Sequence, residues 1–138
     1  MEKYGRIDYL VTNAAVSTHM GGFFDAEEKA IMKMWEINFL ATFLLIKETV
    51  PHLAKNPGSS IVVVSSYTGY EFSKLIGHYA ITKTALLGLT KLLGYELQSE
   101  GIRINGVAPG LIKTEFSKEL WKHDEKKSAE LMGVERLG

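Results

Sequence analysis

The stretch Ser60-Ile-Val-Val-Val-Ser65 decides the fold of this chain of 138 residues. It is rich in β-branched residues and is followed by the turn-forming stretch Ser66-Tyr-Thr-Gly69, which predicts a short buried β-strand. Similar runs lie before it, at residues 7–12, and after it, at residues 102–107. The run at residues 7–12 is followed by Asn-Ala-Ala, and the run at residues 102–107 is followed by Ala-Pro-Gly. Turn-forming residues therefore follow all three predicted strands.

Helical patterns fill the two intervals between these strands. Residues 79–97 carry apolar side chains at 81, 85, 86, 89, 92, 93 and 97, and this 3.6-residue spacing predicts a helix. A helix is also predicted over residues 26–53. The resulting βαβαβ order predicts the α/β class, with a Rossmann-like, doubly wound parallel sheet. Apolar residues surround most of the first helix, although packing on a sheet needs only one stripe. We therefore expect a second buried face, against another subunit or against parts of the protein that this chain does not contain.

The composition excludes several functional classes. The net charge is zero and the pI is about 6.9, so we expect neither nucleic acid nor an anionic membrane as partner. No apolar run reaches the roughly 18 residues of a membrane span. Cysteine is absent, which fits an intracellular protein, and the four histidines lack metal-ligand spacing, so no metal site is predicted.

Tyr79 and Lys83 are the best candidates for chemistry. Residues four apart share a helix face, so we expect the lysine ammonium to lower the pKa of the phenol, which could then donate or accept a proton. Tyr70 and Lys74 have the same spacing, but glycines bound their segment and predict a loop. The alternative interpretation of Tyr79 and Lys83 is an ordinary pair on a helix surface.

Other polar residues follow the predicted strands. Asn13, Ser66 and the pair Pro109-Gly110 come directly after or close to the three strand ends, and parallel strands bring such ends to one edge, where ligands bind. Ser66 precedes Tyr79 by thirteen residues. Taken singly, these residues are also ordinary turn formers or strand terminators. Asn38, among apolar neighbours, could simply bond to its own helix backbone.

Together these motifs resemble the short-chain dehydrogenase/reductase family. Ser66, Tyr79 and Lys83 match its Ser and Tyr-x-x-x-Lys catalytic residues, and Asn38 in Trp-Glu-Ile-Asn-Phe matches its catalytic asparagine. Residues 8–15 resemble its Asn-Asn-Ala-Gly segment, with Thr and Ala where the family usually has Asn and Gly. Residues 105–114 resemble its Pro-Gly-x-x-x-Thr segment. Several ordered motifs are far more specific than any one of them.

Within the family, the chain is most similar to the peroxisomal and mitochondrial NADPH-dependent carbonyl and retinal reductases of the dehydrogenase/reductase member 4 type. Residues 83–91, 108–114 and 136–138 carry this likeness. It implies NADP(H) rather than NAD(H) as cofactor and a small carbonyl or alcohol substrate, such as a ketone, an aldehyde or a retinal-like molecule. It also implies a homodimer or homotetramer located in the peroxisome, mitochondrion or cytoplasm.

The resemblance also implies roles for single residues. Tyr79 would exchange a proton with the substrate oxygen, Ser66 would hold that oxygen, and Lys83 would bind ribose hydroxyls. Asn38 would bend its helix and hold a water in a proton relay. The implied cofactor contacts are Asn13, Ala14, Tyr79, Lys83, Pro109, Gly110, Ile112 and Thr114. Residues 113–130 would form a substrate lid or simply a solvated helix.

One family motif has no counterpart in the sequence. Family members carry a glycine-rich turn that presents backbone N–H groups to the cofactor pyrophosphate, and residues 1–138 hold no such turn. We therefore expect residues 1–138 to be part of a domain, without its N-terminal glycine-rich unit and its C-terminal strand. The competing interpretation is a catalytically inactive truncated isoform or an interaction fragment of such an enzyme.

Overall fold

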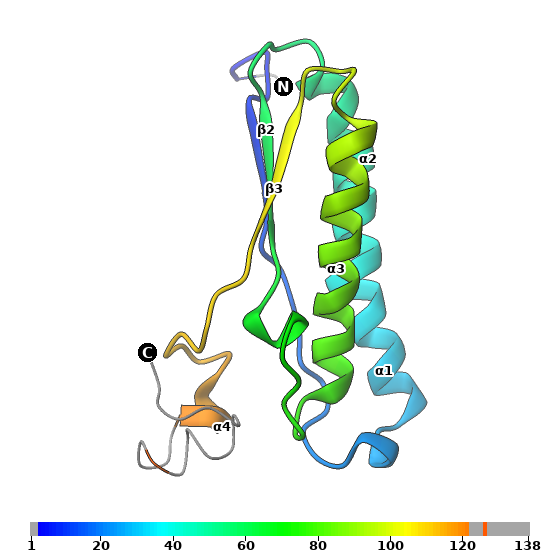
Figure 1. Ribbon diagram of the computed structural model, residues 1–138, viewed down its shortest axis with the longest axis vertical. Coiled ribbons are helices and arrows are strands. Elements are labelled where there is room, and N and C mark those ends of the chain that lie inside the picture. The colour runs from blue at the N-terminus through cyan, green and yellow to red at the C-terminus, as the bar shows by residue number, and fades with distance from the viewer. Residues whose placement is uncertain (1–2, 122–125, 127–138) are drawn as a thin grey trace.

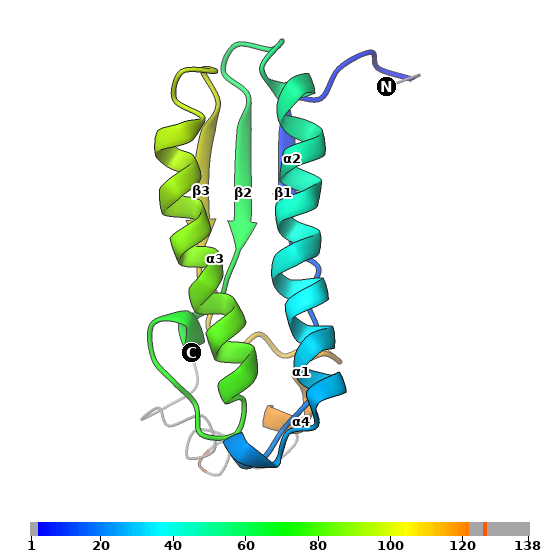
Figure 2. The ribbon, with the colours of Figure 1, turned by 90° about the vertical axis from the view of Figure 1, so that its right-hand side faces the viewer.

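A three-stranded parallel sheet carries the two long helical connections on one of its faces (Figures 1 and 2). The computed structural model describes residues 3–121 and 126. The strands are β1 (Tyr9–Thr12), β2 (Ser60–Val64) and β3 (Arg103–Val107), in the order β1-β2-β3. Ser60 pairs with Tyr9 on one side and Arg103 on the other. The predicted α/β class and parallel strands are confirmed.

Two long helical connections join the strands. The first runs through α1 (Glu28–Trp35), η2 (Glu36–Leu40) and α2 (Ala41–Leu53), and η2 is a single π-helical turn within it. The second is α3 (Gly77–Glu96). Both predicted helices are therefore confirmed, with the π turn as an addition.

Short elements surround the carboxyl ends of the strands. They are η1 (Phe23–Asp25), η3 (Tyr67–Gly69) and α4 (Lys118–Trp121). Residues 70–76, the predicted loop, contain no helix.

The main core lies between the sheet and the two long helices. Ile61 and Val63 of β2 point toward the helices and are fully buried, whereas the alternate strand residues are only half-buried. The other buried members of this cluster come from α2, α3 and the start of β3: Ile46, Leu53, Leu86, Leu89, Leu97 and Ile102. Each such side chain contributes about 1.5–3 kcal/mol on burial, so this layer fixes the helices on the sheet.

A second, smaller apolar cluster lies near the carboxyl ends of the strands. It joins Met34 of α1 with Ile76 and Tyr79 at the start of α3. The cluster fixes the position of the Tyr79 ring relative to α1.

Apolar side chains also remain exposed on the outer surface of the described residues. Tyr9 and Val11 of β1 are exposed, as are Leu40, Leu44 and Leu45 along the first helical connection. What covers them, and with it the expected homodimer or homotetramer, stays a prediction. Within the described part of the chain, no helix is both long and apolar enough to cross a membrane.

Asn38 fastens the loop after β1 to both long helical connections. It is fully buried at the centre of the π turn. Its Oδ1 accepts a hydrogen bond from Val16 N at 2.8 Å, and its Nδ2 donates to Val16 O at 2.9 Å and to Thr82 Oγ1 at 3.0 Å. The bend of the helix that the resemblance implies at Asn38 stays a prediction.

Replacing Asn38 by leucine should destabilise the fold. Asn38→Leu leaves the partly buried N–H and C=O groups of Val16 and the buried Thr82 hydroxyl without this partner, which should lower the free energy of unfolding by about 2–4 kcal/mol. Urea unfolding followed by circular dichroism measures this loss. The control is Thr90→Val, because the Thr90 hydroxyl bonds only to Leu86 O within α3, and it should cost less than about 0.5 kcal/mol. Equal losses in the two variants would contradict the role of Asn38.

Candidate functional site

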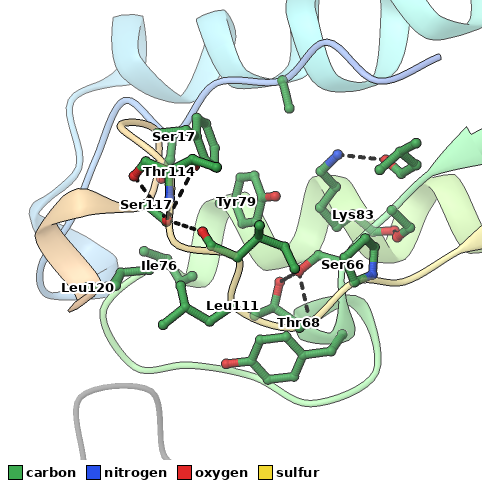
Figure 3. Close-up of a pocket in the computed structure, with 18 of the residues that line it drawn as sticks. Ser17, Ser66, Thr68, Ile76, Tyr79, Lys83, Leu111, Thr114, Ser117 and Leu120 are labelled. Atoms are coloured by element: carbon green, nitrogen blue, oxygen red, sulfur yellow. Dashed lines mark hydrogen bonds between the residues drawn. The ribbon is translucent and has the colours of Figure 1, made fainter. Parts of the chain in front are cut away.

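A cavity of about 600 Å³ lies at the carboxyl ends of the strands (Figure 3). This is the edge at which ligands bind in open parallel sheets. Nine of the ten predicted site residues line the cavity: Asn13, Ala14, Ser66, Tyr79, Lys83, Pro109, Gly110, Ile112 and Thr114. The parallel topology therefore brings together segments that are far apart in the sequence.

Lys83 is almost completely buried, at 2% exposure. Its Nζ donates a hydrogen bond to Val64 O at 2.9 Å, and its own carbonyl accepts one from Ser65 Oγ at 2.8 Å. Burial disfavours the charged ammonium and lowers the pKa of Lys83 to about 8. The lysine is thus held against the end of β2 by both its side chain and its backbone.

Tyr79 lies beside Lys83 and has a pKa above its ordinary value. Burial of the phenol raises this pKa, and interaction with the Ser66 hydroxyl opposes the rise. The Lys83 Nζ lies 5.6 Å from the centre of the Tyr79 ring. The prediction that Lys83 lowers the pKa of Tyr79 is wrong for this structure, because the ammonium is directed at Val64 O and desolvation of the phenol is the larger effect.

The second Tyr-x-x-x-Lys match lies outside the cavity. Tyr70 is 67% exposed, and Lys74 is exposed in the same loop. Burial and position therefore distinguish the two matches in the way that the loop prediction indicated.

Ser66 occupies the turn between β2 and η3. Its Oγ accepts hydrogen bonds from Thr68 N at 3.2 Å and from Thr68 Oγ1 at 2.9 Å. The extended backbone of Ser66 and its capping oxygen start the 3-10 turn. This local geometry places the Ser66 side chain at the cavity wall.

Asn38 does not line the cavity. Both N–H donors of its side chain are used, one by Val16 O and the other by Thr82 Oγ1. The fold thus uses both side-chain donors of Asn38 to hold the loop after β1 and α3, and the implied role of Asn38 in a water relay stays a prediction. Thr82 Oγ1 in turn donates to Tyr79 O at 2.7 Å, so Asn38 contacts the Tyr79 backbone through one hydroxyl.

Sequence reasoning missed a set of buried hydroxyls behind the candidate residues. Ser65, Thr68 and Thr82 bond to Lys83, Ser66 and Tyr79, respectively. Their positions in the sequence could have indicated them, since each of these three hydroxyl residues lies within three residues of a predicted site residue. The partners of these hydroxyls depend on tertiary packing, however, and the sequence alone does not show it.

The apolar wall of the cavity was also not predicted in detail. Its members are Met20, Ile76, Leu111, Phe116 and Leu120. The Phe116 ring lies 6.1 Å from the Tyr79 ring, centre to centre. The expected lid begins here with α4, while its residues 122–125 and 127–130 lie outside the described residues, as do residues 136–138.

Comparisons with known proteins agree with this geometry. The family model for short chain dehydrogenases matches residues 1–125. Dehydrogenase/reductase SDR family member 4 of Rattus norvegicus is 46% identical over 134 residues, which cover 96% of this chain and 48% of that protein. Tropinone reductase-like 3 of Erythroxylum coca is 41% identical over 140 residues, which cover 100% of this chain and 53% of that protein. The chain thus spans about half the length of the curated relatives it matches.

A solved structure shows the same arrangement. The structure described as ElxO with NADP bound has a TM-score of 0.83 and 35% sequence identity, and the match covers 94% of this chain and 53% of that one. Its fold, the family model and the curated relatives lead to one conclusion: this chain belongs to the short chain dehydrogenase family.

Proposed function

We propose that the whole protein is an NADP(H)-dependent oxidoreductase that interconverts a small carbonyl compound and its alcohol. The observation that carries this proposal is the placement of Ser66, Tyr79 and Lys83 on one cavity at the carboxyl ends of the strands. A proton donor, a hydrogen-bonding hydroxyl and a buried amine within one cavity can serve the oxygen of a carbonyl group during its reduction.

The residues at this edge fit the nicotinamide half of the cofactor. Lys83 has three N–H donors and uses one for Val64 O, which leaves donors for hydroxyl groups of a ligand. The cavity volume of about 600 Å³ is in the range of small-molecule sites. Asn13, Ala14, Pro109, Gly110, Ile112 and Thr114 would hold the cofactor along the strand ends. Bound there, it would supply or accept a hydride.

NADP(H) is the proposed cofactor rather than NAD(H). Among similar structures, ElxO is described with NADP bound, and so is a short chain dehydrogenase from Shigella flexneri that is 27% identical to this chain. Members of the family thus carry this cofactor on the same fold.

Tyr79 is the proposed general acid and base. Because burial raises its pKa, the phenol stays protonated near neutral pH and is ready to donate to a substrate oxygen. Ser66 donates a hydrogen bond to the same oxygen, and Lys83 binds hydroxyls of the ribose. Asn38 positions the loop after β1 and the backbone of Tyr79 through Thr82.

The first test replaces the proposed acid. In the whole protein, Tyr79→Phe removes only the hydroxyl and should lower kcat for carbonyl reduction by roughly 10²- to 10⁴-fold, because proton transfer is lost. NADPH binding, followed by fluorescence titration, should persist. Tyr70→Phe is the matched control in the exposed Tyr-x-x-x-Lys segment and should keep the parental rate. Full turnover by the Tyr79→Phe protein would refute the assignment.

The second test concerns the pH dependence set by Lys83. Its pKa is about 8 in the folded protein and 10.5 as a free side chain, so between these values the unfolded chain binds the proton more tightly. Stability should therefore rise with pH across this window, by at most about 1.4 kcal/mol per pH unit for one proton. Unfolding free energies of the parent and Lys83→Met at pH 7 and 9.5 measure the difference.

The parent should gain stability relative to Lys83→Met between these two pH values. Lys91→Met removes an exposed lysine from the same helix and is the control, for which the difference from the parent should stay constant. A constant difference for Lys83→Met as well would show that the Lys83 ammonium is not desolvated.

A third test separates the enzyme from an inactive or interaction fragment. The polypeptide of residues 1–138, which has no glycine-rich turn, should show no saturable NADPH binding at micromolar concentrations, since that turn supplies N–H donors to the pyrophosphate. Fluorescence titration of this polypeptide and of the whole protein measures both affinities. Tight binding by residues 1–138 would mean that the turn is dispensable, and no binding by the whole protein would favour the inactive alternative.

A further inference from the structure

Thr68 determines what the hydroxyl of Ser66 can do. A serine hydroxyl has one proton and two lone pairs. Two hydrogen bonds arrive at Ser66 Oγ from Thr68, one from its backbone N at 3.2 Å and one from its Oγ1 at 2.9 Å (Figure 3). With both lone pairs used, the Ser66 hydroxyl is left to act as a donor.

The surroundings restrict where Ser66 can donate. Thr68 is 1% exposed and Ser66 is 8% exposed, so water competes little for either hydroxyl. Ser66 lines the cavity together with Tyr79. Interaction with Ser66 lowers the pKa of Tyr79, which is the direction expected when a hydroxyl donates to a phenolate oxygen.

We propose that Thr68 is a positioning residue that fixes the Ser66 hydroxyl as a hydrogen-bond donor toward the reacting oxygen in the cavity. This inference rests on the proposed function and deepens it, because it explains why Ser66 donates rather than accepts. Thr68 itself touches Ser66 and acts only through it.

The two bonds from Thr68 differ in what they require of the side chain. The backbone N–H of residue 68 caps η3 through Ser66 Oγ, and any residue other than proline supplies this bond. The bond from Oγ1 requires a hydroxyl at position 68. Thr68→Val removes only that hydroxyl at nearly constant shape, and Thr68→Ser retains it.

The kinetic test is made in the whole protein with NADPH. Thr68→Val should lower kcat for carbonyl reduction roughly 3- to 10-fold, the rate equivalent of one hydrogen bond, with an unchanged KM for NADPH. Thr68→Ser should restore the parental kcat. Thr84→Val is the matched control, because the Thr84 hydroxyl bonds to Gly69 O and Ala80 O near the same turn, and kcat should be unchanged.

A double-mutant cycle tests whether Thr68 acts through Ser66. On a Ser66→Ala background, Thr68→Val should cause no further loss of kcat, because its target is already absent. A further loss equal to that in the parent would overturn the proposal. If the valine variant does not fold, Thr68→Ala takes its place in the same cycle.

A second measurement does not depend on turnover. Tyrosine labelled with ¹³C at Cζ reports the ionisation of Tyr79 by NMR, and the spectrum of Tyr79→Phe assigns its signal. Thr68→Val should raise the pKa of Tyr79 relative to the parent, because the Ser66 hydroxyl is then free to turn away from the phenol, and Thr68→Ser should return it. Lys83 beside the ring is the same in all these variants.

The outcomes separate this inference from the proposed function. Turnover by Tyr79→Phe would defeat the proposed function and leave the NMR titration as the test of Thr68. An unchanged kcat and an unchanged Tyr79 titration in Thr68→Val would defeat only the role of Thr68. The role would also fail if Thr68→Ser behaved like Thr68→Val, since the hydroxyl would then not be the feature that matters.

Discussion

The hydrogen bond from Lys83 Nζ to Val64 O is the interaction on which the rest of the site depends. It joins α3 to the last residue of β2 at 2.9 Å, and Ser65 Oγ bonds to Lys83 O in the opposite direction at 2.8 Å. Burying an ammonium costs free energy unless it is hydrogen-bonded, and the lowered pKa of Lys83 reflects that cost. The two bonds fix the rotation of α3, and the position of Tyr79 one turn earlier follows from it.

Buried hydroxyl and amide groups connect α3 to the π turn and to the loop after β1. Thr82 bonds to Tyr79 O, and Asn38 bonds to both Thr82 and the backbone of Val16. The loop after β1, the π turn and α3 thus form one hydrogen-bonded unit. Buried networks of this kind hold a single geometry because an unmade bond in them is expensive.

The strands, the long helices and the polar residues at the strand ends could be predicted because they follow from local patterns and one topological rule. A run of β-branched residues followed by turn formers marks β2, 3.6-residue spacing marks α3, and the parallel order brings the strand ends to one edge. The π turn could not be predicted, since the apolar pattern continues through residues 36–40. The bonds of Asn38 and Thr68 depend on tertiary packing, which sequence spacing does not report.

The direction of the Tyr79 pKa shift illustrates this limit. Spacing alone puts a cation near the phenol and predicts a lowered pKa, but the structure also removes water from both groups, and desolvation acts against each charged form. The pKa of Tyr79 therefore rises while that of Lys83 falls, for the same reason. In the proposed reaction, a phenol held neutral in this way would give its proton to the substrate oxygen near neutral pH, whereas the reverse direction would need the phenolate and be favoured at alkaline pH. Ser66, held as a donor, is the group that moderates this bias, since it stabilises the phenolate without adding a charge.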